Sequence, residues 1–329
     1  MSNFNATEPR LYCVPLPTSD TTHRDPLTAI IDLVEDDGPW TSLSAFRYCE
    51  RIAASHYENF PVASRFLPAR LRPHIAAVYA FARTADDFTD EPQFANIRQE
   101  ALARWEQLLE QCYHQEAIHP IFIALRQTIR EHKIPIAHFR DLLTGFRMDL
   151  TTPSYGTFQQ LRHYCSFAAN PIGRLVLGIH GYQTPDLHRY SDEICTALQL
   201  TNILQDLSVD LQQGKFYLPE EDLLHFGISR QELVEQHHSR AFKELLAFSI
   251  ARVRSLFTRG RPLLRQVSSG LSLELEACCR GGLAILTCIE QRNYEVLNYR
   301  PVLANLELTG IALRSLFAFG RRFLRSDVM

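Results

Sequence analysis

The chain has 329 residues, of which 46% are hydrophobic and 22% are charged, and its formal net charge is −3. This composition is typical of a globular protein that builds one large core or two smaller ones. It excludes a general basic surface, so we expect no nucleic-acid partner, and an anionic ligand would need metal ions or a few well-placed Arg and Lys side chains.

Cysteine and histidine usage predicts no site of its own. The eight cysteines form no CxxC pair and have no zinc-like spacing to histidine, which is typical of core residues in a reducing compartment. The thirteen histidines show no HExxH or paired spacing, so we expect surface or hydrogen-bonded core residues. No basic segment precedes an apolar stretch at the start, and no run reaches the ~18 apolar residues of a membrane span, so we expect a cytoplasmic protein.

The chain begins with a stretch of weak periodicity and then becomes helical. Residues 1–40 are rich in Thr, Pro and Asp, which predicts a weakly ordered arm with one short helix near residues 27–34. From Thr41 onward the pattern is helical almost without interruption, and no convincing strand occurs. No shift in composition divides this part, so we expect one all-α domain over residues 41–300.

The first acidic stripe follows an apolar helix. Residues 75–82 are apolar on nearly every side, which predicts a buried helix. The stripe that continues it consists of Tyr79, Arg83, Asp86 and Asp90, with Asp87 beside it. Two carboxylates on one helix face weaken an isolated helix by a few tenths of a kcal/mol, so we expect positive charge between them. Arg83 could donate to a phosphate or pair with Asp86 and Asp87, and both roles stay open.

The segment 164–174 contains Asn170 and Pro171 within a helical pattern. A proline there removes a backbone hydrogen bond and predicts a kink, which would expose polar groups such as Asn170 inside an apolar cavity. A simple break between two helices accounts for the same residues, and both interpretations stay open.

The second acidic stripe follows another apolar helix, over residues 194–204. Its members, at intervals of three, four and four residues on one predicted helix, are Gln199, Asn202, Asp206 and Asp210. Lys215 comes shortly afterwards and could close over the same ligand as the stripe. A helix C-terminal cation is its alternative role.

Together the two stripes predict a magnesium site. Every available ligand is a hard oxygen, and Mg²⁺ prefers carboxylates combined with water and phosphate oxygens. Two facing acidic stripes would therefore bind a diphosphate through bridging ions, which neutralise the leaving group. The expected metal ligands are Asp86, Asp87, Asp90, Asn202, Asp206 and Asp210.

The end of the chain is basic and amphipathic. From residue 306 to residue 325, four arginines alternate with Leu, Ile and Phe, which predicts a basic amphipathic helix within residues 301–329. Such a helix could bind the inner face of an anionic membrane, or it could pack on the domain or on a partner protein. Both placements stay open.

Four segments resemble the squalene/phytoene synthases: residues 48–91, the region of Tyr164, residues 199–219 and residues 292–297. The resemblance covers most of residues 45–300. It implies the all-α isoprenoid synthase fold, a helical bundle around a central apolar cavity, with Mg²⁺ and prenyl diphosphate bound by two Asp-rich motifs. By motif it assigns Asp86, Asp90, Asp206 and Asp210 to metal and diphosphate, and Tyr79, Arg83, Tyr164, Gln199, Asn202 and Tyr294 to the cavity or the diphosphate.

The chain also departs from the usual pattern of that family. Arg usually precedes the second motif and Glu lies within it, whereas this chain has Gln205 and Val209. An Ala-Gly pair is replaced by Asn170-Pro171, and a Ser-x-Ser-Phe entry by residues 57–60. These variants are similar to the bacterial hydroxysqualene synthases of hopanoid biosynthesis, also called squalene synthases of the HpnC type.

This narrower resemblance implies a reaction. Presqualene diphosphate would ionise, and water would capture the cation to give hydroxysqualene and diphosphate. The four stripe Asp residues would be catalytic, Tyr164 and Asn170 would be candidates for holding the water, no NADPH would be used, and other hopanoid-pathway enzymes would be partners.

Two other functions remain open. The first is condensation of two prenyl diphosphates to presqualene diphosphate, squalene or phytoene. The second is a non-catalytic helical scaffold, which would be expected to have lost part of the Asp quartet, whereas all four residues are present here.

Overall fold

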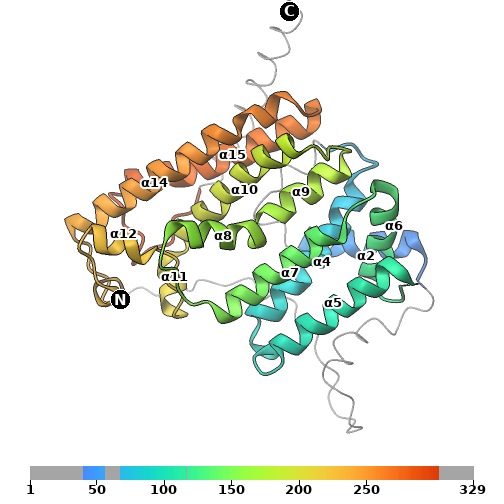
Figure 1. Ribbon diagram of the computed structural model, residues 1–329, viewed down its shortest axis with the longest axis horizontal. Coiled ribbons are helices and arrows are strands. Elements are labelled where there is room, and N and C mark those ends of the chain that lie inside the picture. The colour runs from blue at the N-terminus through green and yellow to red at the C-terminus, as the bar shows by residue number, and fades with distance from the viewer. Residues whose placement is uncertain (1–39, 56–66, 116, 304–329) are drawn as a thin grey trace, which may run out of the picture.

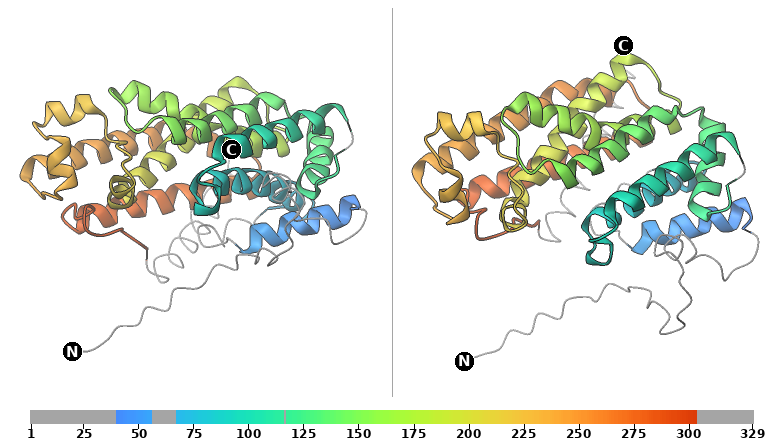
Figure 2. Two further views of the ribbon diagram at one scale, coloured as in Figure 1. Left: turned by 90° about the horizontal axis from the view of Figure 1, so that it is seen from below. Right: turned by 60° about the horizontal axis from the view of Figure 1, so that its bottom comes forward.

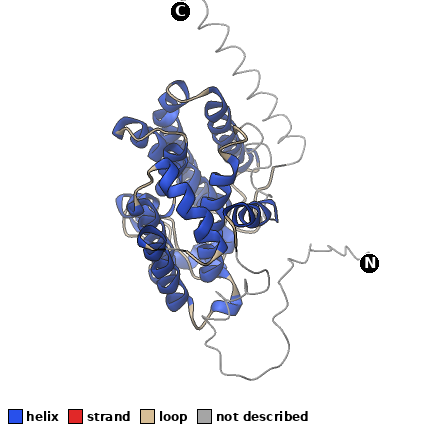
Figure 3. Ribbon diagram, turned by 90° about the vertical axis from the view of Figure 1, so that its right-hand side faces the viewer, coloured by secondary structure: helices blue, strands red, loops and turns tan. Residues whose placement is uncertain are grey.

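The computed structural model describes residues 40–55, 67–115 and 117–303. Within these ranges the regular elements are helices, and the only strand-like pairing is an isolated bridge between Ser154 and Phe216. Figure 3, coloured by secondary structure, shows this helical architecture. The all-α prediction is confirmed.

Helices of very different length follow one another along the chain. In order they are α2 (Ser42–Ser55), α4 (Arg72–Asp90), η2 (Pro92–Phe94), α5 (Arg98–His114), α6 (Pro120–His132), α7 (Ile136–Thr151), α8 (Phe158–Ala168), α9 (Asn170–Ile179), α10 (Pro185–Gln205), α11 (Leu207–Gln212), α12 (Glu220–His225), α13 (Arg230–Val234), α14 (Arg240–Gly260), η3 (Arg261–Arg265) and α15 (Ser269–Gln291). Figures 1 and 2 place α12 and α13 at one end of the molecule and α2 and α6 at the other.

Two hydrophobic clusters form the core. The N-terminal cluster draws on α2, α4, α5, α6 and α7, and the C-terminal cluster on α8, α10, α14 and α15. Helix α9 contributes to both, because Leu175 and Ile179 pack in the first cluster and Leu177 packs in the second. The two halves are therefore joined by shared apolar packing.

Helix α4 has the buried apolar face that its sequence predicts. Pro73 stands in its first turn, and the helix ends at Asp90, just before Pro92, which cannot continue it. Ala77, Ala80 and Phe81 are fully buried. The first stripe thus lies on one continuous helix, as predicted.

The second stripe differs from its prediction, because its helix is interrupted. Helix α10 ends at Gln205, and α11 begins at Leu207 after a bend at Asp206. The amide of Asp210 still donates to the carbonyl of Asp206 at 2.9 Å, so these two carboxylates keep their helical spacing. Asn202, however, stands on a different helix from Asp210, so the prediction of one unbroken stripe is wrong.

A helix break, and not a kink, separates α8 from α9. Ala169 has φ −127° and ψ −46°, and Asn170 and Pro171 open the next helix. Proline is well suited to this position because the first amides of a helix have no intrahelical acceptor. The kink is therefore the wrong one of the two interpretations of this segment.

Parts of the sequence prediction lie outside the described residues. These are the arm up to residue 39 with its short helix, and the amphipathic helix after residue 303. Residues 301–303 are described and are not helical. Among the described residues, no helix is both long and apolar enough to cross a membrane.

Candidate active site

Carboxylates from three helices form one acidic group. Asp86 and Asp90 come from the end of α4, Asp149 from α7 and Asp210 from α11. Burial, together with the charges of Asp90 and Asp149, raises the pKa of Asp86 to about 7, although Arg83 acts in the opposite direction. Burial also raises the pKa of Asp210 to about 7, and Asp206, Asp149 and Asp90 act in the same direction. The ends of the two predicted stripes therefore face each other, with Asp149 between them.

Arg83 neutralises part of the first stripe. One of its terminal nitrogens lies 2.7 Å from a carboxylate oxygen of Asp87, and the other lies 3.4 Å from Asp86. Of the two roles that the sequence left open for Arg83, the structure therefore shows the ion pair with Asp86 and Asp87. Tyr79 is close enough to Arg83 to raise the pKa of its guanidinium, and Asp90 is exposed at the helix end.

Three tyrosines surround Asp149. The Tyr217 hydroxyl donates to Asp149 Oδ1 at 2.9 Å, and Tyr164 also hydrogen-bonds this carboxylate. The Tyr155 ring stacks on Tyr217 with centroids 5.9 Å apart. Burial nonetheless leaves the pKa of Asp149 raised. All three rings are buried, so hydrogen bonds and aromatic packing fix the position of this carboxylate.

Two basic residues lie at the second motif. Arg300 forms an ion pair with Asp206, its Nη2 lying 3.4 Å from Oδ2. The Gln205 amide donates to the Pro301 carbonyl at 2.6 Å, so the segment after α15 contacts the bend between α10 and α11. The charge of Lys215 lowers the pKa of both Asp149 and Asp210, which places its ammonium beside the acidic group.

The remaining predicted residues take other positions. Asn170 is buried, and its Oδ1 accepts from the Thr196 hydroxyl at 3.0 Å. Gln199 is half-buried on α10, and Asn202 is exposed at the end of that helix. Tyr294 has a φ of 65° and packs on the C-terminal hydrophobic cluster. Neither the hydrogen bond of Asn170 nor the packing of Tyr294 involves the acidic group.

Sequence reasoning missed Asp149, Tyr155, Tyr217 and Arg300. Asp149 is a single acid near the end of α7, and no spacing pattern marks it. The sequence carries two weak signals for them, the lysine-aromatic run at residues 215–217 and the arginine just after residues 292–297.

The donor set of the site fits a hard divalent cation. The ligands are carboxylate oxygens whose mutual repulsion and burial raise their pKa values, and a cation relieves both effects. A narrow apolar pocket of about 20 Å³ lies beside Tyr217 and is lined by Leu200 and Ile203, among others. A cavity large enough for a prenyl chain stays a prediction.

A family model described as squalene/phytoene synthase matches residues 53–307, which is most of the chain and contains both acidic motifs. The chain belongs to the squalene/phytoene synthase family. Enzymes of this family process prenyl diphosphates, in agreement with an acidic site that has cationic side chains around it.

Individual members of the squalene/phytoene synthase family resemble the chain to different degrees. It is 38% identical to the hydroxysqualene synthase of Rhodopseudomonas palustris over 64% of this chain and 71% of that protein. It is 30% identical to the phytoene synthase of Arthrospira platensis over 80% of this chain and 89% of that protein. The crystal structure of squalene synthase HpnC from Alicyclobacillus acidocaldarius is 39% identical, with a TM-score of 0.74, and the match covers 77% of this chain and 95% of that one.

Proposed function

We propose that this protein ionises presqualene diphosphate with the help of Mg²⁺ and lets water capture the cation, giving hydroxysqualene and diphosphate. The ionisation step rests on one observation, the meeting of Asp86, Asp90, Asp149 and Asp210 in a partly buried site where their charges oppose one another. Such an excess of negative charge can hold divalent cations together with a diphosphate.

In this proposal the side chains of the site have different roles. The carboxylates of both motifs would hold the metal through oxygen, and bound Mg²⁺ would supply the positive charge that favours loss of diphosphate. Lys215 and Arg300 lie at the second motif, where they can donate charge-assisted hydrogen bonds to phosphate oxygens. Apolar and aromatic side chains next to Tyr217 would keep bulk water away from the cation.

Water capture rests on narrower grounds. The chain shares 38% and 39% identity with a hydroxysqualene synthase and with an HpnC squalene synthase, against 30% with a phytoene synthase. Tyr164 and Asn170 remain the candidates for holding the water. The bond from Thr196 uses the carbonyl oxygen of Asn170, which leaves the amide nitrogen as a donor. No NADPH is needed, because water and not hydride ends the reaction.

Condensation of two prenyl diphosphates is the second candidate. The phytoene synthase match extends over 80% of the chain, whereas the hydroxysqualene synthase match extends over 64%. Both reactions begin with ionisation of an allylic or cyclopropylcarbinyl diphosphate, so the acidic group is compatible with either.

Product analysis in isotopically labelled water separates these functions. Purified protein would be given presqualene diphosphate or farnesyl diphosphate in H₂¹⁸O, with and without Mg²⁺ and NADPH, and products would be identified by mass spectrometry. We expect an ¹⁸O-labelled alcohol from presqualene diphosphate without NADPH. Presqualene diphosphate or a hydrocarbon formed from farnesyl diphosphate would support condensation, and no product from either substrate would favour a scaffold.

The same assay tests the water-holding residue. Asn170→Ala should change the ratio of alcohol to hydrocarbon, and an unchanged ratio would remove Asn170 from this role. Membrane contact and association with hopanoid-pathway enzymes are further proposals. Co-sedimentation of the full chain and of a truncation after Pro301 with anionic liposomes tests the first, since only the full chain should bind.

A further inference from the structure

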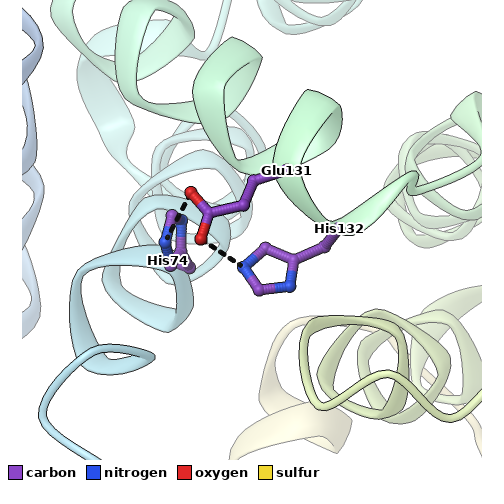
Figure 4. Close-up of side chains that lie close together, drawn as sticks. All are labelled: His74, Glu131 and His132. Atoms are coloured by element: carbon purple, nitrogen blue, oxygen red, sulfur yellow. Dashed lines mark ion pairs between the residues drawn. The ribbon is translucent and has the colours of Figure 1, made fainter.

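Two histidines and a glutamate, drawn in Figure 4, lie close together. They are at the start of α4, whereas the acidic group is at its end. His74 lies in the first turn of α4, and Glu131 and His132 end α6. Nε2 of His74 lies 3.5 Å from one oxygen of Glu131, and Nε2 of His132 lies 4.0 Å from the other. His74 precedes Asp86 by about 18 Å of helix, so this cluster is separate from the acidic group.

The tautomer of His74 follows from its neighbours. Thr128 donates its single hydroxyl proton to the carbonyl of Ala124 at 2.9 Å. Thr128 Oγ1, 2.9 Å from His74 Nδ1, must therefore accept a proton from that nitrogen. The neutral ring then carries its lone pair on Nε2, which faces Glu131.

The same reasoning applies to His132. The backbone of Ile179 hydrogen-bonds this ring in the sense that favours protonation, so a carbonyl accepts from one ring nitrogen. Nε2 is buried and has no hydrogen-bond partner among the described residues, so Nδ1 is the donor. His132 therefore also directs an Nε2 lone pair toward Glu131.

Three acceptor atoms thus face one another without a donor between them. Burial lowers the pKa of both histidines, which favours the uncharged ring that a metal ion binds. An arrangement in which each ligating histidine gives its other N–H to an oxygen is the usual outer shell of a metal site. A cation between them would satisfy the two largely buried ring nitrogens, while the half-exposed Glu131 carboxylate also reaches solvent.

We propose that His74, Glu131 and His132 bind one Zn²⁺ ion, with a fourth position open to solvent. The three ligand atoms already lie within 4.8 Å of one another. Ligands of a tetrahedral zinc ion are ~3.3 Å apart for bonds of ~2.0 Å, so small side-chain rotations close the site. Two imidazoles favour zinc over Mg²⁺, which prefers oxygen. The ion would join the start of α4 to the end of α6.

The exposed side chain of Glu131 gives the site access from solvent, while the charge of a nearby arginine opposes a bound cation. The Glu131 side chain is 54% exposed and lines a surface pocket of about 580 Å³ with Trp40 and Arg126. The charge of Arg70 lowers the pKa of His132 and therefore also acts against a bound cation. Arg70 is exposed, so removing its charge should strengthen zinc binding without disturbing the core.

Zinc binding by the full-length protein tests the proposal. Protein stripped with EDTA would be titrated with Zn²⁺ in excess Mg²⁺, which occupies oxygen-only sites, and bound zinc would be measured by mass spectrometry. Replacement by Co²⁺ gives a visible spectrum that reports tetrahedral nitrogen ligation. We expect one zinc per chain, at least about tenfold weaker binding in Glu131→Gln, weakening by about 10–100-fold in Thr128→Val and tighter binding in Arg70→Gln.

Matched variants make the outcome decisive. Glu235 forms a comparable exposed pair with His237, 3.7 Å away, so Glu235→Gln should leave zinc binding unchanged. Because Glu131 is exposed, Glu131→Gln does not depend on whether a variant of the buried His74 folds. Unchanged zinc binding in Glu131→Gln would overturn the proposal. Loss of zinc binding in Asp90→Asn would also overturn it. The first result would leave the proposed diphosphate reaction untouched, and the second would place the zinc at the acidic group instead.

Discussion

Asparagine in place of Asp210 should stabilise the fold in the absence of divalent cations and remove activity. Burial and the neighbouring acids raise the pKa of Asp210 from 3.8 to about 7, although Lys215 acts in the opposite direction. A pKa difference of this size between the folded and the unfolded chain corresponds to at most about 4 kcal/mol in the free energy of unfolding. Because the side chain is only partly buried, we expect about 1–2 kcal/mol, or a rise in Tm of roughly 2–8 °C.

The pH dependence of this gain identifies its cause. An acid whose pKa is higher in the folded chain binds more protons there, so its contribution to stability is lost as pH rises from about 4 to about 7. The advantage of Asp210→Asn should therefore be largest near about pH 8 and vanish near about pH 4. Thermal unfolding in EDTA, followed by circular dichroism at several pH values, measures it.

The control for this experiment is an exposed acid. Asp186 has a side chain that is 78% exposed, so Asp186→Asn should bring no gain at any pH. Mg²⁺ with diphosphate should raise the Tm of the native chain more than that of Asp210→Asn. Equal gains in the two variants, or a gain at Asp210 that does not fall with pH, would refute the argument from burial and like charge.

Three other changes follow from the site and its supports. Tyr217→Phe removes the 2.9 Å hydrogen bond to Asp149 and should cost about 1.5–3 kcal/mol in urea unfolding, whereas the exposed Tyr299→Phe should change stability by less than about 0.5 kcal/mol. Gly145→Ala brings a Cβ within 2.7 Å of the Ala168 backbone and should cost about 1–3 kcal/mol, while Gly281→Ala, with nothing within 4 Å, should be neutral or stabilising by calorimetry. Arg300→Ala breaks an exposed ion pair, so Tm should barely change. If Arg300 binds phosphate, the KM for the diphosphate substrate should rise, and an unchanged KM would exclude that role.

The first motif could be predicted from sequence because its determinants are local. An apolar run on α4 followed by Asp86 and Asp90 one turn apart specifies both the helix and the shared face of the carboxylates. The bend at Asp206 could not be predicted, since no Gly or Pro stands between Asn202 and Asp210. The groups that contact this bend come from far along the chain, because Arg300 lies 94 residues after its partner Asp206 and Pro301 lies 96 residues after its partner Gln205.

Asp149 illustrates the same limit in the site itself. Its partners are Tyr164 on α8, which the packing of α7 on α8 brings near, and Tyr217, 68 residues away, which the bridge between Ser154 and Phe216 holds close to the end of α7. The histidine cluster is a further example, because His74 meets Glu131 only through the contact of α4 with α6. Spacing within one helix finds functional groups that share the helix, and groups assembled by tertiary packing leave no such pattern.

The balance of charge at the acidic group indicates how a ligand must enter. Among the described residues six carboxylates gather there, Asp86, Asp87, Asp90, Asp149, Asp206 and Asp210, against three cations, Arg83, Lys215 and Arg300. Two of the cations are already engaged, Arg83 with Asp87 and Arg300 with Asp206. A diphosphate alone would add to the negative excess and should be repelled, so its binding should require a divalent cation that neutralises both. The raised pKa values of Asp86 and Asp210 are then the cost, in the ligand-free chain, of a site whose charges balance only when substrate and metal arrive together.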